Sequence, residues 1–201
     1  MNQFELVFRK YLREDAVAFV IELQQKEPFN LRITKPRNSK HGDYKFHPRG
    51  KELATISVNG NLNEQAFLFT FLHEFAHHLS VLNHGHKVQA HGKEWKGNFA
   101  TLLKEAISKN LFDEDISSAI LGEINHLKAT TMGNRAIYRL LHKNEMENST
   151  SHIEELSPGD HFRFRDRLFV VEKKRRTRYL CTEKSSGRQF LFQGFTAIEK
   201  D

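Results

Sequence analysis

Residues 71–78 read FLHEFAHH and contain the pattern H-E-x-x-H. Residues at i and i+4 lie on one face of an α-helix, about 5–6 Å apart, so the imidazoles of His73 and His77 can reach one point. Neutral imidazole nitrogens are good ligands for Zn²⁺. Glu74 follows the first histidine, where its carboxylate can accept a proton from a water bound to the ion. The stretch therefore predicts a zinc-binding helix with a general base.

The residues around this motif favour a buried helix. Apolar residues recur at helical spacing between positions 62 and 79. Asn61 is a suitable N-cap, with Glu64 three residues later as in a capping box. A helix this apolar would bury two histidines and a glutamate at a considerable free-energy cost unless they were paired or bound to a metal ion. Metal binding therefore explains the motif better than a pair of surface histidines does.

A catalytic zinc ion needs a third protein ligand and one open position. His84 and His86 lie in a polar, glycine-containing loop, which is typical of solvated residues. His91 opens the run HGKEW, directly before a second helical pattern whose apolar residues can pack against the first helix. We expect this packing to bring His91 back towards the metal, so His91 is the predicted third ligand. Glu94 is the alternative.

The rest of the first 147 residues predicts a mixed α+β domain. Two helices are expected between residues 4 and 25, and two more follow the HGKEW helix. Three segments alternate like strands before the zinc helix, at 31–34, 44–47 and 53–58. Tyr44 lies in the second of them. Two interpretations of Tyr44 stay open, a hydrogen-bond donor to a developing oxyanion and a structural tyrosine at the sheet edge.

These motifs resemble the SprT-like zinc metallopeptidases, which include the Spartan-type DNA–protein crosslink proteases. The resemblance is carried by HEFAHH followed by HGKEW, with RNSKHGDY at 37–44 and ISVN at 56–59 similar to that family's lead-in strands, and it covers residues 31 to 143. It implies a zincin-like fold, zinc on His73, His77 and His91, and Glu74 as the catalytic base. It also implies a protein or peptide substrate.

Composition narrows the class further. The chain has 201 residues, of which 38% are hydrophobic and 17 are phenylalanine, enough for a sizeable core. A single cysteine excludes a disulfide framework or a four-cysteine zinc site within one chain. The first residues do not resemble a signal peptide, and no apolar run approaches the roughly 18 residues of a membrane span. We therefore expect a cytoplasmic protein with no membrane partner.

The sequence pattern changes near the end of the chain, from helical spacing to a polar stretch and then to short alternating segments. We predict a first domain at 1–147, a polar linker at 148–157 and a small antiparallel β module at 158–201. Members of the SprT-like family often carry a zinc ribbon at this place. Only Cys181 is present here, so the sequence departs from that pattern and a β module without metal is expected.

The β module carries most of the formal net charge of +6, because residues 157–201 hold eleven basic and six acidic residues. Basic side chains bind phosphates and aromatic rings stack on bases. Arginines at 163, 165 and 167 alternate with Phe162 and Phe164. The predicted nucleic-acid contacts are the dense run Lys173, Lys174, Arg175, Arg176 and Arg178, next to Tyr179. The alternative is a solubilising hairpin tip whose phenylalanines belong to the core.

Taken together, the sequence predicts a zinc metalloendopeptidase that acts on proteins, including proteins associated with or crosslinked to DNA. One alternative is a nucleic-acid-binding protein with a closed structural zinc site. A fourth protein ligand such as Glu94 would indicate that class. The other alternative is a zinc hydrolase of a non-peptide bond, which a groove too narrow for an extended chain would indicate.

Overall fold

The H-E-x-x-H motif lies in α3 (Glu64–His84), a helix of 21 residues. Every residue of α3 from 66 to 76 is buried, as the apolar pattern predicted. The N-cap is Asn63 rather than Asn61, because the Asn63 side chain accepts a hydrogen bond from the amide of Ala66 at 2.9 Å. The predicted start of the helix was therefore two residues early.

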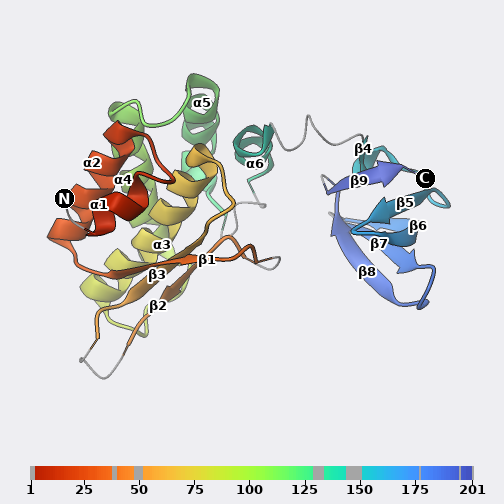
Figure 1. The fold of residues 1–201 in the computed structure, drawn as a ribbon, viewed down its shortest axis with the longest axis horizontal. Coiled ribbons are helices and arrows are strands. Elements are labelled where there is room, and N and C mark those ends of the chain that lie inside the picture. The colour runs from red at the N-terminus through yellow and green to blue at the C-terminus, as the bar shows by residue number, and fades with distance from the viewer. Residues whose placement is uncertain are drawn as a thin grey trace. The chain divides into compact units, whose positions relative to one another are not determined.

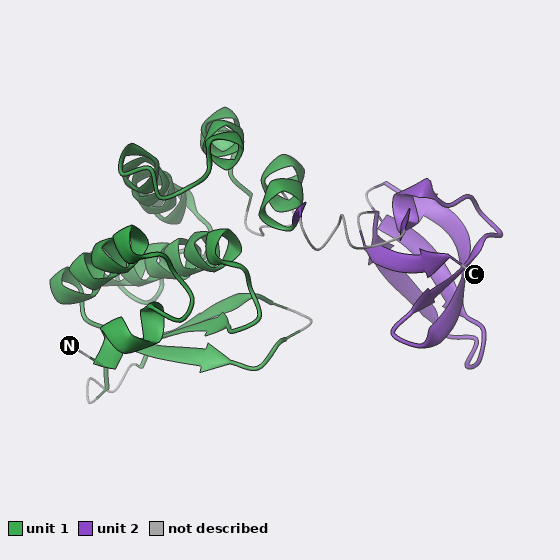
Figure 2. Cartoon of the chain, turned by 45° about the horizontal axis from the view of Figure 1, so that its top comes forward, with its two compact units in different colours: residues 1–142 green, residues 143–201 purple. Residues whose placement is uncertain are grey.

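The structure is a computed structural model that describes residues 3–37, 40–47, 52–128, 134–143, 151–176, 178–194 and 196–200. The chain forms two units, residues 1–142 and 143–201, which Figure 2 colours separately. Within the described residues, no helix is both long and apolar enough to cross a membrane. The other helices of the first unit are α1 (Gln3–Phe8), α2 (Glu14–Lys26), α4 (Lys93–Ser108), α5 (Glu114–Glu123), η1 (Ile124–His126) and α6 (Arg135–Leu141).

The first unit contains a three-stranded mixed sheet in the order β1-β3-β2. The central strand β3 (Thr55–Asn59) runs parallel to β1 (Asn30–Thr34) and antiparallel to β2 (Gly42–Lys45). Helix α3 contacts β2, β3 and α4, so it lies between the sheet and α4 (Figure 1). This arrangement puts the edge strand β2 beside the motif. The 37–44 run ends in this strand, and its residues 38 and 39 lie outside the described part of the chain.

Phenylalanines fill the core on both sides of α3. Phe71 packs edge-on against Phe8 of α1, with ring centroids 5.4 Å apart, and Phe75 against Phe29, 5.7 Å apart. On the other side, Phe69 meets Phe99 of α4 at 5.3 Å. Each of these rings is at most 1% exposed. Truncating such a ring to alanine typically costs about 3–5 kcal/mol, so these contacts hold α3 firmly between its neighbours.

The second unit is a six-stranded antiparallel sheet in the order β4-β9-β5-β6-β7-β8, which agrees in outline with the predicted β module. Its strands are β4 (Ser151–His152), β5 (His161–Phe164), β6 (Arg167–Arg175), β7 (Arg178–Glu183), β8 (Gln189–Gln193) and β9 (Ala197–Lys200), with the 3-10 helix η3 (Ile153–Glu155) after β4.

The predicted linker at 148–157 needs correction. Residues 151 to 155 form β4 and η3, and the buried side chains of Ile153 and Leu156 belong to the core of the second unit. The polar local sequence did not indicate a strand here, because β4 pairs with β9, some 45 residues later in the chain (Ser151↔Ile198). The linker residues 148–150 lie outside the described part of the chain.

The aromatic residues that the structure describes in the second unit belong to its core or pack against it, as the alternative interpretation of the run expected. Phe162 is fully buried and stacks on Phe169, with centroids 5.4 Å apart. Phe164 packs against Phe192, and Tyr179 is only 6% exposed. Strand alternation explains this result, because every second residue of a strand faces the same side. In this unit the aromatic residues occupy the inner side.

Arg167 also makes contacts within the second unit. Its guanidinium lies over the rings of Phe169 and Phe190, at 5.3 and 4.9 Å from their centroids, and forms an ion pair with Glu183. The hydrogen bond from Arg167 is the main reason that the pKa of Glu183 falls to about 2, and Ser186 contributes a second hydrogen bond. This pair connects β6 to the end of β7.

The depressed pKa of Glu183 predicts a pH effect on stability. The folded-state pKa lies below the ordinary value of 4.5, so the pair stabilises the second unit above about pH 4.5 and this contribution is lost as the pH falls towards 2. We expect Glu183→Gln to lower the amide protection factors of β5 to β8 at pH 7, and to weaken their further decrease on acidification. Glu199→Gln, an exposed glutamate of β9, is the control. An unchanged acid response in Glu183→Gln would contradict the prediction.

Candidate metal centre

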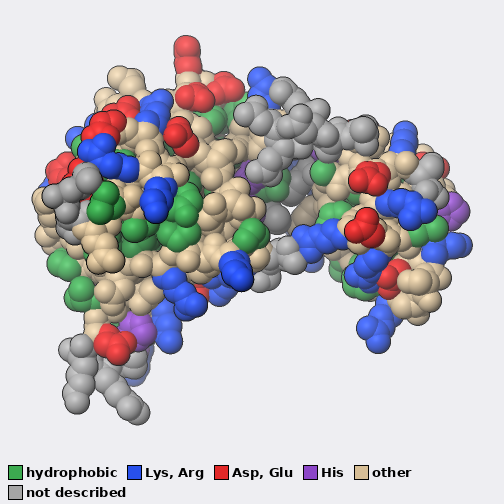
Figure 3. Space-filling model, in the orientation of Figure 1, with side chains coloured by type: hydrophobic (Ala, Val, Ile, Leu, Met, Phe, Trp, Pro, Cys, Tyr) green, Lys and Arg blue, Asp and Glu red, His purple; other side chains and the backbone are tan. Residues whose placement is uncertain are grey.

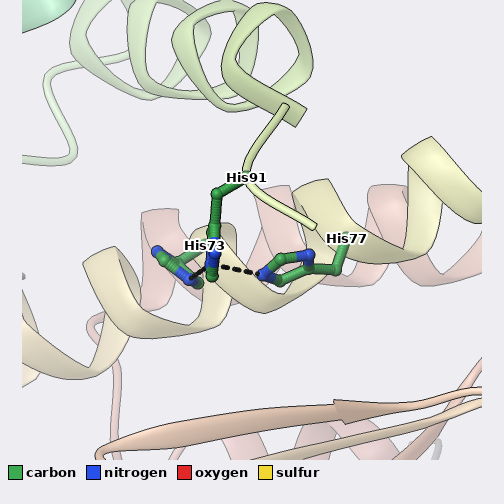
Figure 4. Close-up of side chains that lie close together, drawn as sticks. All are labelled: His73, His77 and His91. Carbon is green, nitrogen blue, oxygen red and sulfur yellow. Dashed lines mark hydrogen bonds between the residues drawn. The ribbon is translucent and has the colours of Figure 1, made fainter. Parts of the chain in front are cut away.

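The three predicted ligands lie together in the first unit (Figure 4). His73 and His77 project from adjacent turns of α3, and His91 reaches them from the loop before α4. Nε2 of His91 lies 3.0 Å from Nε2 of His77 and 3.3 Å from Nε2 of His73. Nitrogens about 2.0–2.1 Å from a tetrahedrally bound ion such as Zn²⁺ are roughly 3.4 Å apart, so this spacing fits a metal ion.

An uncommon backbone conformation directs His91 towards α3. Its φ angle is +61°, in the left-handed region that residues other than glycine rarely adopt. Gly92 follows, and its amide donates to the carbonyl of Gln89 at 3.0 Å. A Cβ atom on Gly92 would lie only 3.0 Å from that same carbonyl oxygen. The H-G pair therefore makes a tight turn, and conformations of this kind cost about 1–3 kcal/mol that the surrounding structure must offset.

Trp95 of α4 packs against all three imidazoles. Its ring centroid lies 4.7 Å from those of His73 and His91 and 5.4 Å from that of His77. The indole Nε1 donates a hydrogen bond to the backbone carbonyl of His73 at 3.2 Å, and the side chain is fully buried. Trp95 therefore fixes the distance between α3 and the loop that carries His91. The sequence indicated only that this tryptophan packs against α3.

Burial keeps the three histidines neutral. Desolvation lowers the pKa of His73 to about 3 and that of His77 to about 4, and it also lowers the pKa of His91. The neighbouring imidazoles add to the effect at His73 and His77, because two cations would repel each other at this distance. Neutral imidazole is the form that binds metal ions. The cluster is therefore prepared for a cation at neutral pH.

Glu74 lies on the side of α3 that faces β2. It is 7% exposed, and burial raises the pKa of its carboxyl group to about 8. The negative charge of Asp43 adds to this rise, while Arg37 and Lys40 oppose it. A carboxylate with a pKa near neutrality can both accept and release a proton. Glu74 follows His73 in the chain, but it is not one of the three residues that converge.

The other candidate ligands do not join the cluster. Among the described residues, the group that can hold a metal ion consists of the three histidines alone. Glu94 lies in the first turn of α4, with Oε1 3.8 Å from Nζ of Lys93. His84 and His86 are exposed, and the ring of His86 stacks on Phe46, 5.7 Å between centroids.

Tyr44 lies beside the cluster and is linked to a histidine that the sequence did not single out. Its ring is nearly parallel to that of His77, with centroids 6.3 Å apart. Its hydroxyl lies 3.5 Å from Nδ1 of His78, which is 3% exposed. Burial raises the pKa of Tyr44 to about 12, so the hydroxyl keeps its proton. Tyr44 thus connects the edge strand to α3, and its role as an oxyanion donor stays a prediction.

The predicted nucleic-acid residues cluster at the tip of the β6–β7 hairpin. All five are exposed, and Arg175 and Arg178 lie directly opposite each other. Opposed like charges destabilise a hairpin, so their pairing here is a cost to stability. Lys174 extends over the ring of Tyr179, 5.4 Å from its centroid. Figure 3 shows several Lys and Arg side chains on the visible face of this unit.

Comparison with protein-family models, with curated proteins and with solved structures returned no match to this chain. The case for the site therefore depends on its own geometry. Three buried or half-buried imidazoles converge, and the buried Glu74 follows His73 on the same helix.

The first test of the centre is its metal content. We expect about one metal ion per chain, and His91→Ala should lose it as completely as His77→Ala, because three ligands are the minimum for a site of this kind. Glu94→Ala is the matched control and should keep the ion. Elemental analysis of the three purified variants measures the outcome. A Glu94→Ala protein without metal beside a fully loaded His91→Ala would exclude His91 as the third ligand.

Proposed function

We propose that the first unit is a zinc-dependent metalloendopeptidase of the zincin-like, SprT-like type. The observation that supports it is the convergence of three histidine nitrogens next to a buried glutamate on the same helix. Three protein ligands leave the fourth tetrahedral position for water or substrate, which distinguishes catalytic from structural zinc sites. Because no carboxylate or thiol of the described residues completes the cluster, the closed structural site is the weaker alternative.

The residues fit zinc chemistry. Imidazole suits zinc, and three such ligands on tetrahedral spacing match its preferred geometry. When bound, zinc would supply Lewis acidity that polarises a carbonyl group and lowers the pKa of water. Glu74 would accept the proton of the attacking water and pass it to the leaving amine. The three histidines would stay neutral, and Trp95 would hold two of their rings at 4.7 Å.

The edge strand supports a polypeptide substrate. β2 is the last strand of the order β1-β3-β2, so among the described residues one of its edges pairs with no strand. An extended peptide can add to such an edge through backbone hydrogen bonds. β2 also borders the site, because Tyr44 lies against His77. A substrate chain paired with β2 would therefore pass next to the histidines.

Glu74→Gln separates chemistry from binding. The amide cannot accept a proton but is nearly the same size, so we expect the variant to keep its fold and metal while losing about 10²–10⁴ in hydrolysis rate. Cleavage of an unfolded protein substrate, measured beside metal content, tests this. Glu64→Gln, at the start of the same helix, serves as control. Full activity in Glu74→Gln would exclude Glu74 as the base. A wild-type protein that cleaves no peptide but hydrolyses a non-peptide bond would favour the alternative of a zinc hydrolase of a non-peptide bond.

We further propose that proteins on DNA are the substrates, and that the hairpin tip of the second unit contacts DNA phosphates. The support is electrostatic, since five exposed cations gather at one tip. Base stacking on aromatic rings is not part of this proposal, because the described rings of this unit lie in its core or pack against it. Phosphate contacts alone predict binding without sequence preference and with strong salt dependence.

Replacing Lys173, Lys174, Arg175, Arg176 and Arg178 by serine should weaken DNA binding at low salt. The slope of log affinity against log salt should fall by about 0.7–0.9 for each cation that no longer neutralises a phosphate. Fluorescence anisotropy at several salt concentrations measures both effects. Lys184→Ser/Arg188→Ser, two exposed cations around the β7–β8 turn, is the control. If the hairpin variant binds DNA as tightly as wild type, the five cations do not contact phosphates, and the alternative of a solubilising hairpin tip is favoured.

A further inference from the structure

Gly42, the first residue of β2, is the point where the edge strand comes closest to Glu74. A Cβ atom at Gly42 would lie 2.6 Å from Oε1 and 2.7 Å from Cγ of Glu74, and 2.8 Å from Cγ2 of Thr70. Real Cβ atoms essentially never make contacts this short. Glu74 and Thr70 are one helical turn apart on α3 and are 7% and 4% exposed. Both side chains therefore pack directly against the bare backbone of Gly42.

The strand cannot easily move away from the helix at this position. Gly42 pairs with Val58 of the central strand, and the amide of Asn59 donates to the carbonyl of the preceding His41 at 2.8 Å. The Asn59 side chain donates to the carbonyl of Lys40 at 3.1 Å, and its Oδ1 accepts from Nε of Arg37 at 2.8 Å. Asn59 is 2% exposed, so these bonds are shielded from water. The segment before β2 is thus tied to β3.

The need for glycine is steric rather than conformational. Among the described residues, the glycines with positive φ are Gly85, Gly159 and Gly187, and Gly42 adopts an ordinary strand conformation. Alanine can therefore take this backbone conformation without strain. Its methyl group must displace something, and the side chain of Glu74 supplies the two nearest atoms. The part most free to move is the end of that side chain.

We propose that Gly42 is a positioning residue, which lets β2 hold the side chain of Glu74 in its place on α3. The catalytic consequence rests on the proposed function, whereas the steric coupling between the two residues does not. Because position 42 has no side chain, the backbone of β2 itself closes one side of the space around Glu74. The carboxylate is thereby confined between α3 and the edge strand.

Gly42→Ala tests the catalytic consequence in the full-length protein. The three histidines are untouched, so metal content should stay at the wild-type level. Displacing the base by about 1 Å should lower kcat by about 10²-fold, with KM changed less than about threefold. Gly60→Ala is the matched control, because its Cβ would lie 2.8 Å from Cγ2 of Ile33 and 3.3 Å from the hydroxyl of Tyr11, not against Glu74. The proposal would be overturned if Gly42→Ala kept the wild-type kcat. It would also be overturned if both variants lowered kcat and raised KM by similar factors.

A double-mutant cycle tests the steric coupling without any need for activity. Glu74→Ala deletes Oε1 and Cγ, the two closest atoms. Gly42→Ala should therefore lower the thermal midpoint by several degrees less in the Glu74→Ala background than in wild type. This cycle applies even if Gly42→Ala alone folds poorly, because the double variant should then recover fold and metal. An equal loss in both backgrounds would overturn the proposal. If wild type cleaves no peptide but the cycle shows coupling, the proposed function fails and the positioning of Glu74 stands.

Discussion

The burial of polar side chains in α3 is the constraint on which the first unit depends. His73, Glu74 and His77 lie on a helix whose residues from 66 to 76 are all buried. Removing such groups from water is expensive unless something compensates. The histidines respond by staying neutral, and they converge with His91 on a point that suits a cation. The glutamate shares this environment, and its pKa rises to about 8. The same burial thus disfavours the charged form of the histidines and of the glutamate alike.

Two elements far apart in the chain shape this environment from opposite sides. α4 brings Trp95 and the turn that carries His91, and β2 brings Gly42 and Tyr44. On the first side the contact is aromatic, and one indole touches all three imidazoles. On the second side the contact is with a bare backbone, which only glycine allows. The phenylalanine core keeps α3 fixed between them, so small changes on either side act directly on the site.

The second unit shows how composition alone can mislead. Its alternating arginines and phenylalanines match the composition of a nucleic-acid-binding surface. The fold separates them, because strand alternation turns Phe162 and Phe169 into the core and leaves most of the cations outside. Arg167 goes with the aromatic residues instead, held by two rings and Glu183. What remains exposed at the tip of the β6–β7 hairpin is a cluster of cations without the aromatic residues, a simpler surface than the sequence indicated.

The sequence by itself determined what depends on local spacing. The i, i+4 period places His73 and His77 on one helix face, and the apolar pattern makes that helix a buried one. The choice of His91 over Glu94 was a matter of packing between two helices, and only the tertiary structure brings Nε2 of His91 to within 3.0 Å of Nε2 of His77. The contact between Gly42 and Glu74 joins elements 32 residues apart in number. No local pattern encodes such an approach, because it depends on where a sheet edge comes to rest against a helix.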